Sequence, residues 1–192
     1  MRQPSNRWPR RPIQAWQAQD IAQWRACQTR QRSYADDVLT AIEALRGRLD
    51  VEMYGDVIYA DAQHPAERFP LRALRSRQWQ PGLPSVLVTG GVHGYETSGV
   101  HGALRFVDTQ AERFAGRANL LVVPCVSPWA YERIQRWNFD ALDPNRNFQA
   151  GSPAGESAAL VALLAPLRGR VLMHIDLHET TDSDETALRP AL

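Results

Sequence analysis

The sequence has 192 residues, of which 44% are hydrophobic and 22% are charged, and this balance suits one globular domain with a sizeable core. A formal net charge of +1 gives no general attraction to nucleic acid or to a membrane surface, so neither is expected as a partner. All 22 basic residues are arginine, and the absence of lysine excludes Schiff-base chemistry and a P-loop lysine.

The cysteines and the N-terminal segment predict a cytoplasmic protein. Cys27 and Cys125 form no CxxC motif, and two distant cysteines do not make a disulfide framework, so we expect reduced thiols. No apolar run approaches the roughly 18 residues that a membrane span needs. Residues 1–20 are polar and rich in arginine, without the apolar centre of a secretory signal.

The first half of the chain predicts a loose basic arm, two helices and a hairpin. Apolar residues recur at helical spacing in residues 34–49, more clearly than in residues 13–29. The two apolar segments that follow are typical of paired strands, with a turn suggested at Gly55-Asp56 inside the first of them. The predicted elements are an arm at 1–12, helices at 13–29 and 34–49, and strands at 51–60 and 69–74.

The second half predicts three buried strands separated by helices. The strands are expected at 86–89, 119–124 and 171–177, and the helices at 96–114 and 156–167. This alternation predicts an α/β fold, with a largely parallel or mixed sheet and helices on both faces. We divide the chain into an N-terminal arm with helices, residues 1–50, and a main α/β domain, residues 51–192.

A glycine-rich corner, Gly90-Gly91-Val92-His93-Gly94-Tyr95-Glu96, follows the predicted strand 86–89. Active sites of open α/β sheets lie outside the carboxyl ends of the strands, and His93 falls there. Glu96 would enter the first turn of the next helix and point back to the same side. His93 and Glu96 are therefore candidate metal ligands, although a glycine loop with an incidental histidine is the plain alternative.

His178 adds a third candidate ligand at the end of the predicted strand 171–177. Strand alternation places His174, Asp176 and His178 on one face. His178 is nearest the strand end, whereas His174 lies deeper and is interpreted as a hydrogen-bonded core residue. Asp176 either orients a ligand or caps a neighbouring helix. Two histidines and one glutamate, with one position left open, form the ligand set of a catalytic zinc hydrolase. The histidines interpreted as structural or surface residues are His64 and His101.

Residues 136–148 form a second informative segment, which has no helical or strand periodicity. The segment carries two arginines, three asparagines and two aspartates between aromatic residues. A long loop with so many charged and amide side chains more often has a functional role than not. Arginine in particular is suited to binding a carboxylate through two parallel hydrogen bonds. A surface loop with ordinary salt bridges is the alternative.

Three motifs occur in order along the chain and are followed by His178: His93-x-x-Glu96, Arg136-x-Asn138 and Asp143-x-Asn145-Arg146-Asn147-Phe148. Together they resemble the zinc metallocarboxypeptidases and the related succinylglutamate desuccinylase and aspartoacylase group. The resemblance covers residues 85–180 and implies a zinc carboxypeptidase-like fold. The two loop motifs favour the carboxypeptidase side, whereas Ser127-Pro128 departs from the Asn-Pro that the family often has there.

The resemblance implies zinc-dependent cleavage of a C-terminal peptide bond, in a peptide or amino-acid-derived substrate with a free carboxylate. The cofactor would be one zinc ion per chain. The implied roles are zinc ligation by His93, Glu96 and His178, acceptance by Asp143 of a hydrogen bond from His93, oxyanion stabilisation by Arg136, and binding of the substrate carboxylate by Asn145 and Arg146.

The assignment lacks the carboxylate general base that this chemistry needs. Strand alternation aims Glu179 away from the ligands, and Glu185 in a polar loop is a weak candidate. We therefore expect the sequence to be the N-terminal portion of a longer enzyme, incomplete at its C-terminus. Two other functions stay open: a zinc amidohydrolase that deacylates N-acyl amino acids, and a non-catalytic fragment that binds metal or peptide. Nucleic-acid binding through the arginine-rich arm is disfavoured by the near-neutral charge.

Overall fold

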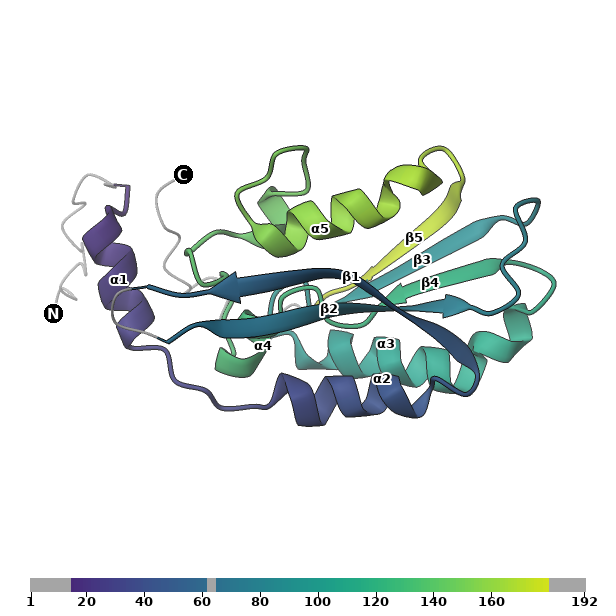
Figure 1. The fold of residues 1–192 in the computed structure, drawn as a ribbon, viewed down its shortest axis with the longest axis horizontal. Helices are drawn as coiled ribbons and strands as arrows, with labels where there is room; N and C mark the ends of the chain where they lie inside the picture. Colours follow the sequence, from purple (N-terminus) through teal and green to yellow (C-terminus); the bar gives the residue numbers. More distant parts are fainter. Residues whose placement is uncertain (1–14, 62–64, 180–192) are drawn as a thin grey trace, which may run out of the picture.

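The computed structural model describes residues 15–61 and 65–179, which form a five-stranded sheet flanked by helices (Figure 1). The strands are β1 Leu49–Tyr59, β2 Glu67–Ser76, β3 Ser85–Gly90, β4 Asn119–Val123 and β5 Val171–Leu177. Their order in the sheet is β1-β2-β4-β3-β5. β2 is antiparallel to β1 and β4, whereas β3 is parallel to β4 and β5. The predicted mixed α/β fold is confirmed.

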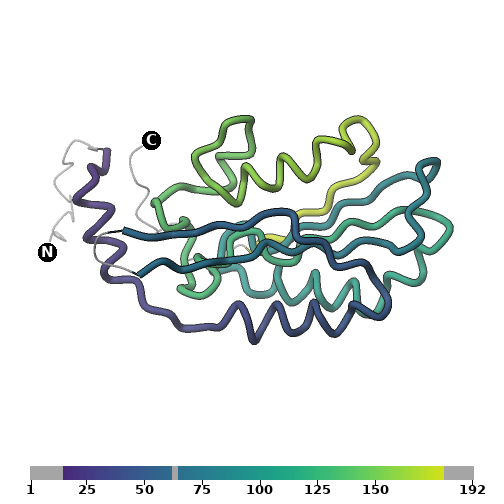
Figure 2. Tube along the Cα trace, in the orientation of Figure 1, coloured from purple at the N-terminus to yellow at the C-terminus, as the bar shows by residue number. Residues whose placement is uncertain are grey.

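Helices cover both faces of the sheet (Figure 1, Figure 2). Helix α5 (Gly155–Leu164) lies on one face, and helices α2 (Thr40–Ala44) and α3 (Thr97–Gln110) lie on the other. The remaining helical segments are α1 Ala18–Ala26, η1 Ala35–Leu39, η2 Ala111–Phe114, α4 Pro128–Arg133, η3 Pro144–Arg146 and η4 Ala165–Leu167. Within the described part of the chain, no helix combines the length and apolar character needed to cross a membrane.

Helix α4 was not predicted, and the reason is its length. Six residues are too few to show a helical period, and all six are buried, so no polar face marks the helix. Ile134 follows it with φ 56°, a left-handed conformation that ends the helix. The 3-10 turn η3 likewise lies inside the segment 136–148 that was predicted to lack helical structure.

The turn predicted at Gly55-Asp56 is wrong, because strand β1 continues through both residues. The pairing with β2 shifts register between Met53 and Gly55, which is the signature of a β-bulge. A Cβ atom on Gly55 would lie 2.8 Å from Cβ of Ala159 in α5. Glycine at this point therefore serves the close approach of α5 to the strand rather than a reversal of the chain.

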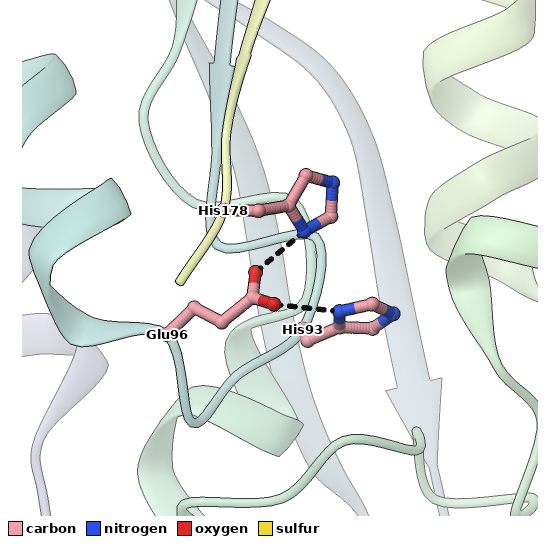
Figure 3. Close-up of side chains that lie close together, drawn as sticks. All are labelled: His93, Glu96 and His178. Carbon is pink, nitrogen blue, oxygen red and sulfur yellow. Dashed lines mark hydrogen bonds and ion pairs between the residues drawn. The ribbon is translucent and has the colours of Figure 1, made fainter. Parts of the chain in front are cut away.

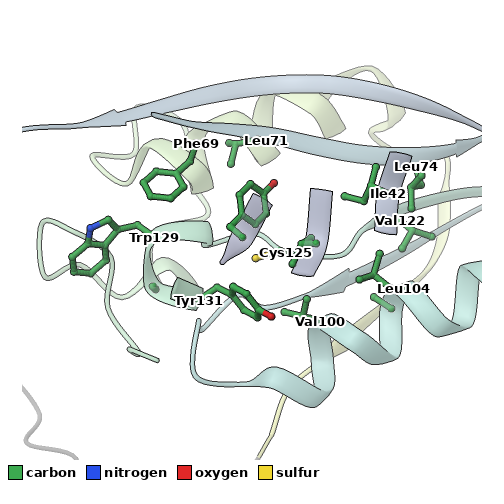
Figure 4. Close-up of a cluster of buried hydrophobic side chains, with 14 of the residues drawn as sticks. Ile42, Phe69, Leu71, Leu74, Val100, Leu104, Val122, Cys125, Trp129 and Tyr131 are labelled. Carbon is green, nitrogen blue, oxygen red and sulfur yellow. The ribbon is translucent and has the colours of Figure 1, made fainter. Parts of the chain in front are cut away.

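Two buried clusters lie on opposite faces of the sheet, and alternation along β4 supplies both. Val122 packs into the cluster beneath α2 and α3, whereas Leu121 and Val123 pack into the cluster beneath α5. Figure 4 shows the first cluster, to which α2 contributes Ile42, α3 contributes Val100 and Leu104, and β4 contributes Val122. Burial of each such aliphatic side chain contributes about 1.5–3 kcal/mol to the driving force for folding.

Strand β5 was predicted to be buried, and this prediction is wrong for most of its length. Leu172 is 73% exposed, Met173 is 53% exposed and Ile175 is 39% exposed. Within the described residues β5 is the edge strand and pairs with β3 alone. His174 is also exposed, with Nε2 located 2.8 Å from Oγ1 of Thr89, so its interpretation as a core residue fails for the same reason.

Replacing Gly94 by alanine should destabilise the fold, because the new Cβ atom would overlap the peptide bond between Ala130 and Tyr131 in α4. Backbone atoms cannot rotate out of the way, so we expect the free energy of unfolding to fall by about 3 kcal/mol or more. Urea denaturation followed by circular dichroism measures this change. Gly47→Ala is the matched control, since a Cβ atom there meets no atom within 4 Å. Equal stability of the two variants would contradict the close packing of α4 against the loop after β3.

Candidate active site

The parallel pairing of β3 with β5 brings the candidate ligands to one edge of the sheet. Gly90 and Leu177, the last residues of these strands, are register partners. His93 lies in the loop that follows Gly90, and His178 directly follows Leu177. Glu96 is the N-cap residue of α3 and reaches the same place from the start of that helix.

Figure 3 shows the three side chains converging. Nδ1 of His93 lies 2.9 Å from Oε1 of Glu96, and Nδ1 of His178 lies 2.8 Å from Oε2 of the same carboxylate. The ligand atoms of the three residues all lie within 4.8 Å of one another. The side chains of His93 and Glu96 are almost fully buried, whereas that of His178 is 30% exposed, so the cluster opens to solvent on the His178 side.

The donor atoms of this cluster fit a divalent metal such as zinc. Oε2 of Glu96 is buried, and its contact with Nδ1 of His178 at 2.8 Å lacks the geometry of a hydrogen bond, so within the described residues no hydrogen bond satisfies it. A buried carboxylate oxygen in that condition raises the free energy of the fold, and a bound cation would remove the penalty. Two imidazole nitrogens with one carboxylate form a catalytic zinc ligand set. The identity of the metal stays a prediction.

Aspartates hold the outer nitrogens of both imidazoles. Nε2 of His93 lies 3.0 Å from Oδ1 of Asp143, and Nε2 of His178 lies 2.7 Å from Oδ2 of Asp176. The hydroxyl of Thr89 donates to Oδ1 of Asp176 at 2.6 Å. Metal-binding histidines commonly donate their second N–H to a carboxylate, which fixes the tautomer and the ring orientation. These contacts favour the interpretation in which Asp176 orients a ligand.

Asp143 connects the ligand cluster to Arg136. Its Oδ2 accepts hydrogen bonds from Nε and Nη2 of Arg136 at 3.3 and 3.1 Å, and its Oδ1 accepts one from the backbone N–H of Asn145 at 2.9 Å. Burial opposes the ionisation of Asp143, but the hydrogen bonds and the charges of His93 and Arg136 hold its pKa down at about 2. Burial lowers the pKa of His93, yet its bonds to Asp143 and Glu96 raise the pKa overall. Asp143 is therefore a charged acceptor at neutral pH.

Tyr95 is a residue of this site that the motif alone does not reveal. Its ring lies nearly parallel to the imidazole of His93, at 3° with centroids 5.9 Å apart. Its hydroxyl accepts a hydrogen bond from Nη1 of Arg136 at 3.4 Å. The only signal in the sequence is its position between His93 and Glu96. Arg136 is thus held from two sides, by Asp143 and by Tyr95.

The two residues predicted to bind a substrate carboxylate follow Asp143 in the turn η3. Arg146 is exposed, and its Nη1 donates to the carbonyl oxygen of Asn145 at 3.2 Å. Asn145 is half-buried, and its backbone is tied to Asp143. An exposed guanidinium can meet an incoming carboxylate without the loss of a buried ion pair.

Other candidate residues lie apart from the ligand cluster or outside the described residues. His101 is exposed on α3 and contacts a tyrosine of α4. Glu179 accepts a hydrogen bond from the backbone N–H of Ser98 in the first turn of α3, so its carboxylate is occupied at the helix terminus. His64 and Glu185 lie outside the described residues.

Many solved structures resemble this chain. A candidate metallopeptidase from Shewanella amazonensis is 28% identical, with a TM-score of 0.58 over 73% of this chain and 53% of its own. An aspartoacylase-family protein from Mesorhizobium loti is 28% identical, with a TM-score of 0.50 over 68% of this chain and 40% of its own. A metallo-carboxypeptidase from Burkholderia cenocepacia is 16% identical, with a TM-score of 0.56 over 73% and 40%, and bears on the fold alone. No protein-family profile and no curated protein matches the sequence.

The chain has a zinc carboxypeptidase fold and matches a metallocarboxypeptidase and aspartoacylase-like family in structure. The Shewanella and Burkholderia structures are named as a metallopeptidase and a metallo-carboxypeptidase. The chain spans about half the length of the Shewanella protein, 53%.

Asp176→Asn should weaken zinc binding by about 10- to 100-fold, because an amide in place of the carboxylate no longer holds Nε2 of His178 in its orientation. Competition with a chromophoric chelator measures the dissociation constant. Asp50→Asn, at a side chain that is 59% exposed on β1, is the matched control and should leave the constant unchanged. Equal affinity of both variants would count against a positioning role for Asp176.

Proposed function

We propose that this chain forms the zinc-binding and carboxylate-binding part of a hydrolase that cleaves a C-terminal peptide bond. The observation that carries the proposal is the convergence of His93, Glu96 and His178 within 4.8 Å, beside an Arg136 held by Asp143. The substrate class is a peptide or an amino-acid derivative with a free carboxylate.

His93, Glu96 and His178 would hold one zinc ion, which supplies a hydrolytic nucleophile near neutral pH and polarises the scissile carbonyl. Asp143 and Asp176 keep each imidazole turned so that Nδ1 faces the carboxylate of Glu96. Because both aspartates are themselves hydrogen-bonded, the ligand geometry is set before a substrate arrives.

Arg136 would stabilise the negative oxygen that develops during amide cleavage. Asp143 and Tyr95 fix its guanidinium, so little reorganisation is needed as that charge forms. Arg146 and Asn145 would bind the substrate carboxylate, with two parallel hydrogen bonds from the guanidinium, and so restrict cleavage to the terminal residue. We assign no general base among residues 15–61 and 65–179.

A second candidate function is the deacylation of N-acyl amino acids. The observation that favours it is the aspartoacylase-family neighbour, which is as similar in sequence as the metallopeptidase neighbour, at 28% identity each. The same ligands and the same Arg136 would serve this reaction, since both reactions hydrolyse an amide. The arginine and asparagine motifs of residues 136–148 favour the carboxypeptidase reaction.

His93→Ala and His178→Ala should each abolish stoichiometric zinc binding, because either change leaves two ligands where a catalytic site needs three. Elemental analysis of the purified protein gives the zinc content per chain. His101→Ala, outside the ligand cluster, should keep one zinc per chain. Zinc retained at full stoichiometry in both variants would contradict the assignment of His93 and His178 as zinc ligands.

Assays with C-terminal peptides and with N-acetyl or N-succinyl amino acids separate the two reactions. For the preferred class, Arg136→Ala should lower kcat by about 10²- to 10³-fold. Arg146→Ala should act mainly on KM, because it removes binding that substrate and transition state share. Cleavage of N-acyl amino acids alone would replace the first proposal by the second. A chain that binds zinc yet hydrolyses neither class would support the non-catalytic alternative for these 192 residues.

A further inference from the structure

Two consecutive buried residues at the start of α5 contact the loop that carries Arg136 and Asp143. We infer that Glu156 and Ser157 are positioning residues of the candidate site, which fix this loop on both sides of Asp143. Glu156 is 1% exposed and Ser157 is fully buried, so neither meets a substrate. The inference rests on the proposed function, because it matters to chemistry only if Asp143 supports a metal site.

The first fixed point is the carboxyl group of Glu156. Its Oε2 accepts a hydrogen bond from the hydroxyl of Tyr59 at 2.6 Å and another from Nδ2 of Asn138 at 3.3 Å. Burial raises the pKa of Glu156. Burial of an acidic group destabilises the fold, and an apolar residue of similar size at this position would avoid that free-energy penalty. The presence of an acid here is therefore best explained by the hydrogen bonds that it accepts. The amide of Asn138 is the group that Glu156 orients.

Asn138 in turn shapes the loop. Its Oδ1 accepts hydrogen bonds from the backbone N–H groups of Asp140 and Leu142, both at 3.0 Å. These two bonds close a compact turn, in which Ala141 adopts a φ of 56°. Because Oδ1 and Nδ2 belong to one planar amide, a change in the orientation that Glu156 imposes would break both backbone bonds.

The second fixed point is the hydroxyl of Ser157, which donates to the carbonyl oxygen of Pro144 at 3.1 Å. Asn138 and Pro144 stand on either side of Asp143 in the sequence. Asp143 must face His93 with one oxygen and Arg136 with the other. The hydrogen bonds to Asn138 and Pro144 restrict the backbone on both sides of Asp143. The carboxylate of Asp143 can therefore face His93 and Arg136 at the same time before a substrate binds.

Hydrogen exchange and metal affinity, measured on the 192-residue chain, test the inference together. Glu156→Ala should accelerate exchange of the amides of Asp140 and Leu142 by about 10-fold or more, because their acceptor becomes mobile. It should also weaken Co²⁺ binding by about 10-fold, through Asp143 and His93. Glu156→Gln keeps an acceptor oxygen of the same shape, and should restore both properties to near the wild-type values.

Ser157→Ala serves as a second, milder variant, because it removes one hydrogen bond and little volume. It should accelerate exchange of the backbone amides of residues 145–147, and it provides this readout even if Glu156→Ala fails to fold. Leu160→Ala is the matched control, since this buried residue of the same helix packs in the cluster beneath α5 and has an apolar side chain that makes no hydrogen bond to the loop. The control should lower global stability while leaving loop exchange and Co²⁺ affinity unchanged.

The outcomes separate this inference from the proposed function. Equal loop exchange in Glu156→Ala, Ser157→Ala and wild type would overturn the inference, and so would the same acceleration in Leu160→Ala. If the loop responds as expected but wild type binds no Co²⁺, the anchors stand and the proposed metal function fails. If wild type binds Co²⁺ and the loop does not respond, the metal site stands and the positioning role fails.

Discussion

The parallel pairing of β3 with β5 is the constraint on which the candidate site depends. Because the two strands run in the same direction, their last residues, Gly90 and Leu177, meet at one edge of the sheet. His93 and His178 are far apart in the sequence but follow these neighbouring strand ends, and Glu96 enters between them from α3. The meeting of the three side chains is therefore a product of sheet topology, which the carboxyl ends of parallel strands provide in many α/β proteins.

One carboxylate then extends this cluster into a larger site. Asp143 faces the imidazole of His93 and the guanidinium of Arg136 through different oxygens, and its low pKa keeps it charged between them. The residues proposed to bind a substrate carboxylate, Asn145 and Arg146, follow it directly. The proposed metal-binding and carboxylate-binding parts of the site thus share Asp143 and its loop as a support, so a shift of this loop would disturb both.

Hydrophobic periodicity predicted the long helices and central strands well, because α3 carries a clear apolar stripe and β4 is buried along its whole length. The same signal misled for β5, since an apolar strand is buried only if another element lies beyond it, and no local pattern encodes that neighbour. The placement of His93 and His178 followed from strand ends alone. Tyr95 and Glu156 could not be predicted, because ring stacking on an imidazole and a hydrogen bond to a distant loop exist only in the folded chain.

Glu96 is the N-cap residue of α3 as well as a member of the candidate ligand cluster, and Glu179, next to His178, accepts a hydrogen bond from the first turn of the same helix. Binding of a cation at Glu96 and folding of the first turn of α3 would therefore be thermodynamically linked, so that each favours the other. A ligand that binds only the folded form stabilises it by about 2.7 kcal/mol at a free concentration 100 times its Kd. Chelation would then loosen the junction of β5 with α3 first, while the hairpin of β1 and β2, at the opposite edge of the sheet, would keep its protection.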